Sequence, residues 1–525
     1  MNGGESLIRA LAAHGVDTCF ANPGTSEMHM VQAIDAVDDM RAVLCLFEGI
    51  CSGAADGYGR MRGVPATTLL HLGAGFGNGI ANFHNARRAG TPIVNLVGEH
   101  ARHHVPFDAP LTSDIEGVAR PVSSWLRTAR NSEGLASDGL DALCAALTPT
   151  PEPTGSIATL SIPADCSWGP GHSPDQREIK IVLNTIEESV IATCAGKLND
   201  RSVLLVDGAG LSRAGAMAAG RIATKTGCRV LTITFPAKAE AGTGIFPIER
   251  LPYFPYQVLE TLAGVEHIVL AGAQPPVSFF AYEASPSSLV PEGCGLTRLA
   301  NRHDDVIGAL QGLADYLDAP MTPTGIAASP RPELPTGDLH AESIARSLAA
   351  KIPEGSIVTN DSGGGGVAYP ALQYSVEHTF LFLTGGSIGQ GGPVAVGAAV
   401  AAPGTRVFAL IGDGGAMYTN QFLWTAAREN LPITVVIYSN RTYNILDFEY
   451  HRLGMTEPGE SGSKMFDLST PPIDWVALAK GQGVPGLAAT TAEEFNHALD
   501  QALETDGPFL IEAVTPAAAA PALPR

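Results

Sequence analysis

Short apolar runs alternate with amphipathic helical runs along most of the chain. In the first part, "RAVLCLF" (41–47) precedes "EGICSGAADGYGRM" (48–61), and "ATTLLH" (66–71) precedes a long helical run at 72–90. Apolar strands of this length that alternate with helices are typical of a parallel sheet covered by helices on both faces. The pattern therefore predicts the α/β class.

This alternation occurs in three blocks, and each predicts one mostly parallel sheet covered by helices on both faces. We place the three domains at 1–170, 185–325 and 338–515. Proline-rich "TPTPEPTG" (148–155) lies near the end of the first block, and "MTPTGIAASPRPELPTG" (321–337) is typical of a linker before the third. The final ten residues, 516–525, have no periodicity, so we expect a loose tail.

Composition and charge exclude several classes of function. Of the 525 residues, 45% are apolar and 16% are charged, as in ordinary globular proteins. The net charge of −21 argues against nucleic acid or an anionic membrane as a partner. No apolar run is long enough to span a membrane, and the N-terminus lacks a signal-peptide layout. Eight scattered cysteines without a CxxC pair favour reduced, mostly buried thiols in a cytoplasmic protein.

Polar residues follow the predicted strands at their carboxyl ends, where parallel α/β sheets bind ligands. Thr25, Glu48 and His71 hold such positions in the first block. In the third block, Asp413 follows "VFALIG" (407–412) and Asn440 follows "ITVVIYS" (433–439). We therefore expect two groups of candidate site residues, one at each sheet edge.

Asp413 and Asn440 are separated by 27 positions, an interval that holds one helix and one strand. Both side-chain oxygens should reach the same sheet edge, where they would suit Mg²⁺ together with phosphate oxygens. Gly412, Gly414 and Gly415 let the backbone approach a bulky anion, and the amides that open the next helix can donate to it. The spacing favours a metal–diphosphate anchor over the alternative, a strand-to-helix turn capped by Asp413.

The run at 412–446 resembles the thiamine diphosphate (ThDP) motif, which starts with Gly-Asp-Gly and ends in an Asn-Asn pair. The relatives are the 2-oxo acid decarboxylases and acetolactate synthases. "NPGTSE" (22–27), "LFEGICSGAADGYGR" (46–60) and "LLHLGAGFGN" (69–78) are similar to benzoylformate decarboxylases in particular. The resemblance implies a pyrimidine-binding domain, a middle domain and a diphosphate-binding domain, in that order.

The resemblance also implies the cofactors, which are thiamine diphosphate and Mg²⁺. Asp413 and Asn440 would bind the metal by their side chains, and Thr442 by its backbone carbonyl. Ser439 departs from the family, which has an asparagine at this position. The other implied cofactor-binding residues are Glu48, Asn78, Gly386, Ile388, Gly414, Gly415, Ala416 and Tyr443. FAD is not expected, because "DGAGLSRAG" (207–215) lacks the dinucleotide-binding pattern GxGxxG.

Two residues carry the implied catalysis. Glu48 matches the glutamate that faces the cofactor's aminopyrimidine, and the alternative is an acid stabilised by the start of a helix. His71 matches the proton-relay histidine that also contacts substrate, and the alternative is a packed histidine satisfied by the backbone. Thr25 matches a serine that touches substrate. The second relay histidine of those decarboxylases is missing from "PPVSFFAY" (275–282), which holds Phe279 and Phe280 instead.

The implied function is decarboxylation of a small-molecule 2-oxo acid through a ThDP-bound enamine, as in benzoylformate decarboxylase. One alternative is an acetolactate synthase-like carboligase that joins the enamine to a second carbonyl compound. A remote alternative is a catalytically idle ThDP-binding subunit. The resemblance implies a homodimer with ThDP at the subunit interface, or a tetramer of two such dimers. The charge and hydropathy given above argue against a nucleic acid or a membrane as partner.

Overall fold

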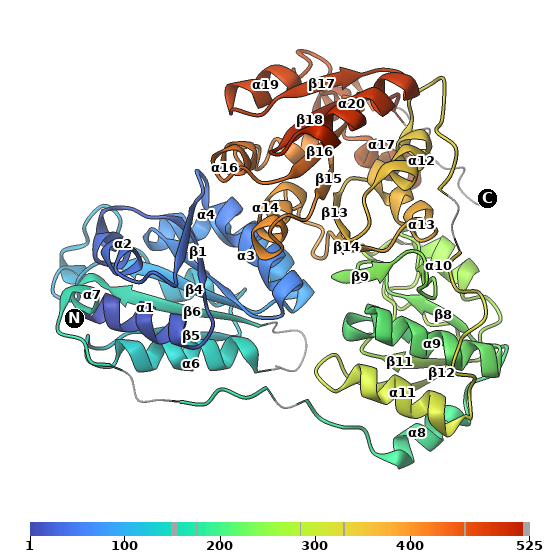
Figure 1. The fold of residues 1–525 in the computed structure, drawn as a ribbon, viewed down its shortest axis with the longest axis horizontal. Coiled ribbons are helices and arrows are strands. Elements are labelled where there is room, and N and C mark those ends of the chain that lie inside the picture. The colour runs from blue at the N-terminus through green and yellow to red at the C-terminus, as the bar shows by residue number, and fades with distance from the viewer. Residues whose placement is uncertain are drawn as a thin grey trace.

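The computed structural model describes residues 1–148, 156–173, 177–181, 183–283, 285–328, 331–455 and 458–517. It contains three sheets with helices around them (Figure 1), which confirms the predicted α/β class. Most of the proline-rich run 148–155, two residues of the predicted linker at 321–337 and most of the predicted tail lie outside the described residues.

The first sheet has six parallel strands in the order β2-β1-β3-β4-β6-β5. Its strands are β1 (Thr18–Asn22), β2 (Arg41–Leu44), β3 (Ala66–Leu70), β4 (Ile93–Glu99), β5 (Trp125–Thr128) and β6 (Ile157–Pro163). Its helices are α1 (Gly3–Ala13), α2 (Met28–Asp35), α3 (Glu48–Arg62), α4 (Leu72–Ala89), α5 (Ile115–Ala119), α6 (Leu135–Leu147) and α7 (Ala164–Trp168). The strand order reverses between β1 and β3, which creates a crevice at their carboxyl ends.

The second sheet has five strands in the order β10-β8-β7-β11-β12, all parallel. They are β7 (Ser202–Val206), β8 (Arg229–Thr232), β10 (Glu249–Arg250), β11 (His267–Ala271) and β12 (Gly295–Ala300). The helices of this region are α8 (Glu188–Ala195), α9 (Arg213–Thr226), α10 (Pro255–Thr261) and α11 (Val306–Tyr316).

The third sheet has seven strands in the order β17-β18-β16-β15-β13-β14-β9. They are β9 (Lys238–Ala241), β13 (Ser356–Asp361), β14 (His378–Phe382), β15 (Val407–Gly412), β16 (Ile433–Ser439), β17 (Gly486–Ala489) and β18 (Phe509–Val514). Its helices are α12 (Ala341–Lys351), α13 (Ala368–Leu372), α14 (Gly391–Ala401), α15 (Asp413–Ala416), α16 (Phe422–Arg428), α17 (Asn444–Arg452), α18 (Glu460–Phe466), α19 (Trp475–Gly481) and α20 (Ala492–Glu504). The strand order reverses between β13 and β15, so a second crevice lies there.

Strand β9 comes from the block that the sequence assigns to the middle domain, yet it pairs antiparallel with β14 at the edge of the third sheet. The sequence did not predict this strand, because "KAEA" is short and half polar and carries no apolar run. The chain between β8 and β10 of the second sheet thus supplies the edge strand of the third sheet.

Helices α3 and α14 pack closely against each other and join the first sheet to the third (Figure 1). A Cβ at Gly57 would lie 2.1 Å from the carbonyl oxygen of Val394, and one at Gly397 would lie 1.8 Å from that of Ala54. Only glycine permits this approach of the two backbones. The contact therefore fixes α3, which begins at Glu48, on the third sheet.

Two predictions about the whole chain can be compared with the structure. All eight cysteines are free and six of them are buried, which confirms the predicted state of the thiols. Among the described residues, no helix is both long and apolar enough to cross a membrane.

Candidate active site

Glu48 opens α3 just beyond the end of β2, and only 7% of the residue is exposed. The side chain of Asn78, on α4, donates a hydrogen bond of 2.9 Å from Nδ2 to Oε2 of Glu48. The other carboxyl oxygen of Glu48, Oε1, lies 3.1 Å from the position that a Cβ at Gly75 would take. Because Gly75 has no side chain, it does not crowd this oxygen. The structure therefore brings the predicted residues Glu48 and Asn78 together.

His71 precedes α4 at the end of β3, and its side chain is 25% exposed. Its Nδ1 lies 2.7 Å from Oε2 of Glu27, whose side chain is fully buried, and 3.2 Å from Oγ of Ser26. Thr25, an exposed residue, opens the same short turn, η1 (Thr25–Glu27). The partners of the His71 ring are thus side chains, and the main one is a carboxylate.

Sequence reasoning missed Glu27. The signal was present in "NPGTSE", because an acid three residues after a turn residue has the spacing of a capping box. In the structure, Glu27 closes this box by accepting the backbone N–H of Gly24 at 2.7 Å.

Asp413 and Asn440 follow the neighbouring parallel strands β15 and β16, so both reach the same edge as predicted. The backbone N–H of Arg441 donates to Oδ2 of Asp413 at 2.7 Å, and that of Thr442 donates to Oδ1 of Asn440 at 3.1 Å. Burial raises the pKa of Asp413, because the charged form loses hydration. A cation at this point would offset that cost.

The turn between β14 and α14 lies beside the Asp413 loop. Ile388 is half-buried, and its Cβ is 3.6 Å from the position that a Cβ at Gly415 would take. Gly386 has a φ of +77°, and the ring of Phe279 packs against it. A Cβ at Gly386 would lie only 2.4 Å from this ring. In the Asp413 loop, Gly414 leaves room for the ring of Tyr443, which lies 2.3 Å from its Cβ position. The structure thus places the predicted residues Gly386, Ile388, Gly414, Gly415 and Tyr443 around one edge.

Phe279 also lines a cavity of about 320 Å³ at the carboxyl edge of the second sheet. Phe235 and Tyr253 contact the ring of Phe279 and share this cavity, and Thr384 borders it on the side of the third sheet. The segment at 275–282, where the resemblance implies a second relay histidine, therefore contributes an aromatic ring to this cavity.

Asp361 ends β13 and was not predicted as a site residue, although it is a strand-end carboxyl group like Asp413. Its Oδ2 accepts the backbone N–H groups of Gly389, Gln390 and Gly391 at 2.7, 2.7 and 3.1 Å. Burial nevertheless raises its pKa to about 6. Asp361 thus holds the turn that carries Ile388.

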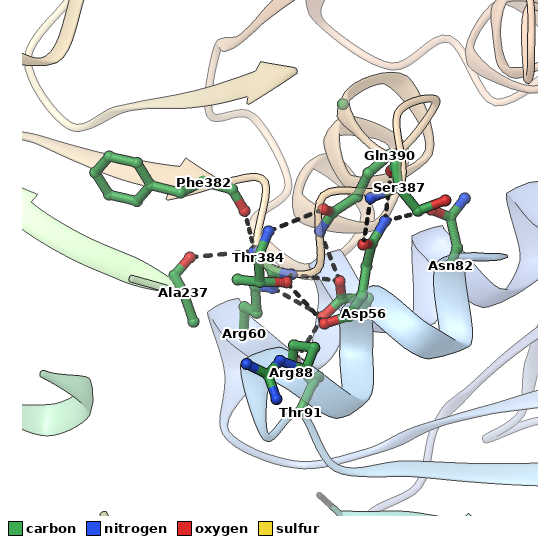
Figure 2. Close-up of polar contacts among 12 residues, drawn as sticks. Asp56, Arg60, Asn82, Arg88, Thr91, Ala237, Phe382, Thr384, Ser387 and Gln390 are labelled. Atoms are coloured by element: carbon green, nitrogen blue, oxygen red, sulfur yellow. Dashed lines mark hydrogen bonds and ion pairs between the residues drawn. The ribbon is translucent and has the colours of Figure 1, made fainter. Parts of the chain in front are cut away.

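A buried polar network fixes the same turn to the first sheet (Figure 2). Arg60 donates from Nε and Nη2 to both carboxyl oxygens of Asp56, and from Nη2 to the hydroxyl of Thr384 at 3.1 Å. Gln390 donates to Asp56 at 2.9 Å, and Asn85 donates to the carbonyl of Ser387 at 2.8 Å. Helices α3 and α4 therefore position the turn at 384–390.

Comparison with known proteins shows the family of the chain. The N-terminal and C-terminal TPP binding domains of thiamine pyrophosphate enzymes match residues 1–118 and 366–513. The acetolactate synthase-like large subunit IlvX of Mycobacterium tuberculosis is 47% identical over 98% of this chain and 99% of its own length. The chain belongs to the ThDP-dependent decarboxylase and acetolactate synthase family.

Two further relatives are decarboxylases. Benzoylformate decarboxylase of Pseudomonas aeruginosa is 29% identical over 96% of this chain and 97% of its own. The structure of a ThDP-dependent 4-hydroxybenzoylformate decarboxylase of Rhodococcus jostii RHA1 superposes with a TM-score of 0.84 at 26% identity, covering 98% and 99% of the two chains.

The residues of this ThDP enzyme fit the cofactor. Asp413, Asn440 and the carbonyl of Thr442 offer hard oxygen donors. Gly414 and Gly415 bring the backbone close to them without side chains, and the N–H of Gly414 donates to Oδ1 of Asp413 at 2.8 Å. Within the described ranges, no cluster of three or more His, Cys, Asp or Glu could hold a metal. The implied set contains one carboxylate only, so it depends on diphosphate oxygens for its remaining ligands.

In one copy of this ThDP enzyme, the two groups of site residues belong to different sheets. The network of Figure 2 joins their supporting helices and turns. Among the described residues, however, no hydrogen bond joins Glu48 or His71 directly to Asp413 or Asn440.

Replacing Asp361 should change the pH dependence of stability. Its folded-state pKa of about 6 lies above the ordinary 3.8, so the folded chain holds this proton more tightly than the unfolded chain does. The contribution of Asp361 is therefore fully present below pH 3.8 and is lost as pH rises through about 6. Urea unfolding of the cofactor-free chain should show this slope, and Asp361→Asn should lack it. Asp506→Asn, at an exposed site, is the control, and equal slopes in the parent and Asp361→Asn would contradict the assignment.

Proposed function

We propose that this chain is a ThDP- and Mg²⁺-dependent enzyme that decarboxylates a 2-oxo acid and then protonates the product. The observation that carries the proposal is the pair of polar groups at the first sheet edge, Glu48 with Asn78 and His71 with Glu27. When bound, the cofactor would supply a thiazolium ring that takes up the electron pair left behind when CO₂ departs.

Asp413, Asn440 and Thr442 would hold Mg²⁺, and Ile388 would support the cofactor from below. Glu48 would exchange a proton with the pyrimidine nitrogen. Its burial supports this role, because a carboxyl group in a dry site interacts strongly with a single partner. The amide of Asn78 orients the carboxyl group by its hydrogen bond to Oε2.

His71 would deliver the proton that replaces CO₂. Its partial exposure lets water restore that proton, and Glu27 holds the ring in place. The rings of Phe279 and Phe280 contact each other, and Phe279 packs on Gly386, so they add an apolar surface beside the turn that carries Ile388. Such a surface would disfavour the charged carboxylate of a substrate relative to its neutral product. A 2-oxo acid with an apolar side chain fits these surroundings.

An acetolactate synthase-like carboligation is the second candidate, and the similarity to IlvX supports it. In that reaction, the carbon that loses CO₂ attacks a second carbonyl compound and receives no proton from His71. The two reactions therefore differ in their product, which is an aldehyde in one case and a 2-hydroxyketone in the other.

We further propose a homodimer in which a second copy completes each site. Among the described residues of one chain, no hydrogen bond joins Glu48 to Asp413, which supports this proposal. Large apolar side chains near both groups are also exposed, including 47% of Leu46 before α3 and 56% of Tyr418 after α15. Burial of such side chains against a second copy would be favourable.

Glu48→Gln should slow activation of the cofactor without removing its binding. Gln keeps the size of Glu48 and its bond with Asn78, but it cannot exchange a proton with the pyrimidine nitrogen. General acid–base groups contribute about 10²–10⁴-fold, so exchange of the C2 proton of bound ThDP with deuterium should slow by about that factor. Quenched-flow NMR measures this exchange, and an unchanged rate in Glu48→Gln would show that the activating acid lies elsewhere.

Two inactive variants should restore activity when they are mixed. Glu48→Gln disables one group of site residues, and Asp413→Ala disables the other by weakening Mg²⁺-dependent ThDP binding. If each site combines groups from two chains, refolded mixtures should regain about one quarter of parental turnover, because about half of the pairs are mixed and each holds one intact site. The control is a mixture of Glu48→Gln with Asp506→Ala, a variant in which both groups of site residues are intact. Its turnover shows how much activity an active partner regains after the same refolding. If the mixture of Glu48→Gln with Asp413→Ala shows no turnover while the control mixture is active, each site lies within one chain.

A further inference from the structure

We infer that Glu27 is a positioning residue that fixes the tautomer of His71, so that Nε2 is the atom that gives and takes the catalytic proton. This inference rests on the proposed function, because it assigns a partner to the proposed proton donor. The capping-box spacing of the sequence gives Glu27 a role in the turn only, and not one toward His71.

The hydrogen bonds around Glu27 determine which nitrogen of His71 carries a proton. A carboxylate only accepts hydrogen bonds, and Oε2 of Glu27 accepts both the backbone N–H of Gly24 and the ring of His71, each at 2.7 Å. Oε1 accepts the hydroxyl of Ser26 at 2.9 Å. Nδ1 of His71 must therefore donate, which leaves the lone pair of the neutral ring on Nε2.

Two glycines leave space for this pair. A Cβ at Gly98, on β4, would lie 1.7 Å from Oε1 of Glu27. A Cβ at Gly24 would lie 2.3 Å from Nδ1 of His71. Any larger residue would displace the carboxylate or the ring, so the local sequence permits the pair where an ordinary side chain would block it. The full burial of Glu27 also protects the bond from competing water.

The proton then follows one route. His71 takes a proton from water at Nε2 and becomes doubly protonated, while Nδ1–H stays on Glu27. Nε2 gives its proton to the substrate-derived carbon that has lost CO₂, and the ring returns to its starting tautomer. Over the whole cycle one C–H bond forms and one O–H bond of water breaks, and the hydroxide left in solvent combines with the released CO₂ as bicarbonate, so no oxidant or reductant is needed.

The test compares two variants of similar size. Glu27→Gln keeps an oxygen that can accept from Nδ1, whereas Glu27→Met fills the space without an acceptor. Glu99→Gln is the matched control, because Glu99 is a half-buried acid at the neighbouring strand end whose side chain accepts the N–H of His100. The first measurement is the ¹⁵N spectrum of histidine-labelled, cofactor-free protein, with the His71 signals assigned by His71→Asn.

We expect an Nδ1–H ring for His71 in the parent, in Glu27→Gln and in Glu99→Gln, and loss of that tautomer in Glu27→Met. A parent spectrum with His71 protonated on Nε2 alone overturns the inference, and this result does not depend on any variant folding. An unchanged Nδ1–H tautomer in folded Glu27→Met overturns it as well.

The second measurement is turnover with ThDP and Mg²⁺. Glu27→Met should lower kcat by about 10²-fold at unchanged ThDP affinity, and Glu27→Gln should restore most of it. Equal kcat in Glu27→Met and the parent overturns the positioning role. If His71→Ala keeps parental turnover, the proposed function loses its proton donor, while the ¹⁵N result still decides whether Glu27 sets the tautomer.

Discussion

Asp56 and Arg60 form an ion pair that is almost completely buried between α3 and the turn after β14. Buried charges are costly unless every donor and acceptor has a partner. Here Asp56 also accepts from Thr91 and Gln390, and Arg60 also donates to the carbonyls of Phe382 and Ala237. The pair thus joins α3 of the first sheet to β14 of the third and to the segment that leads into β9.

The Asp56–Arg60 ion pair helps to position both groups of candidate site residues. Glu48 is the first residue of α3, and Ile388 lies two positions before Gln390, so both depend on the same anchor. The close approach of α3 to α14 acts in the same direction, because glycines at the contact let the two backbones pack directly against each other. A rigid connection of this kind suits a site whose groups must meet a large cofactor in one geometry.

Much of the fold could be predicted, because its signals are local. Alternating apolar strands and helices predicted the parallel sheets, and residues just past strand ends predicted the positions of Glu48, Asp413 and Asn440. The contacts that support these residues depend on tertiary structure. Gln390 and Asp56, which share a hydrogen bond, are 334 positions apart in the sequence. Likewise β9 pairs with β14, a strand that lies much later in the chain. Glu27 could have been suspected from its capping-box spacing, but its contact with His71 required the pairing of β1 with β3.

The chemical claim rests on what happens to the carbon that loses CO₂. Purified protein with ThDP and Mg²⁺ should be incubated with a panel of 2-oxo acids that range from pyruvate to aryl-substituted ones, while CO₂, aldehyde and 2-hydroxyketone are followed together. A proton donor at His71 and an apolar surface at Phe279 predict equal amounts of CO₂ and aldehyde, with acids of apolar side chain preferred. CO₂ accompanied by 2-hydroxyketone in place of aldehyde, or no CO₂ from any acid despite bound ThDP, would contradict the account.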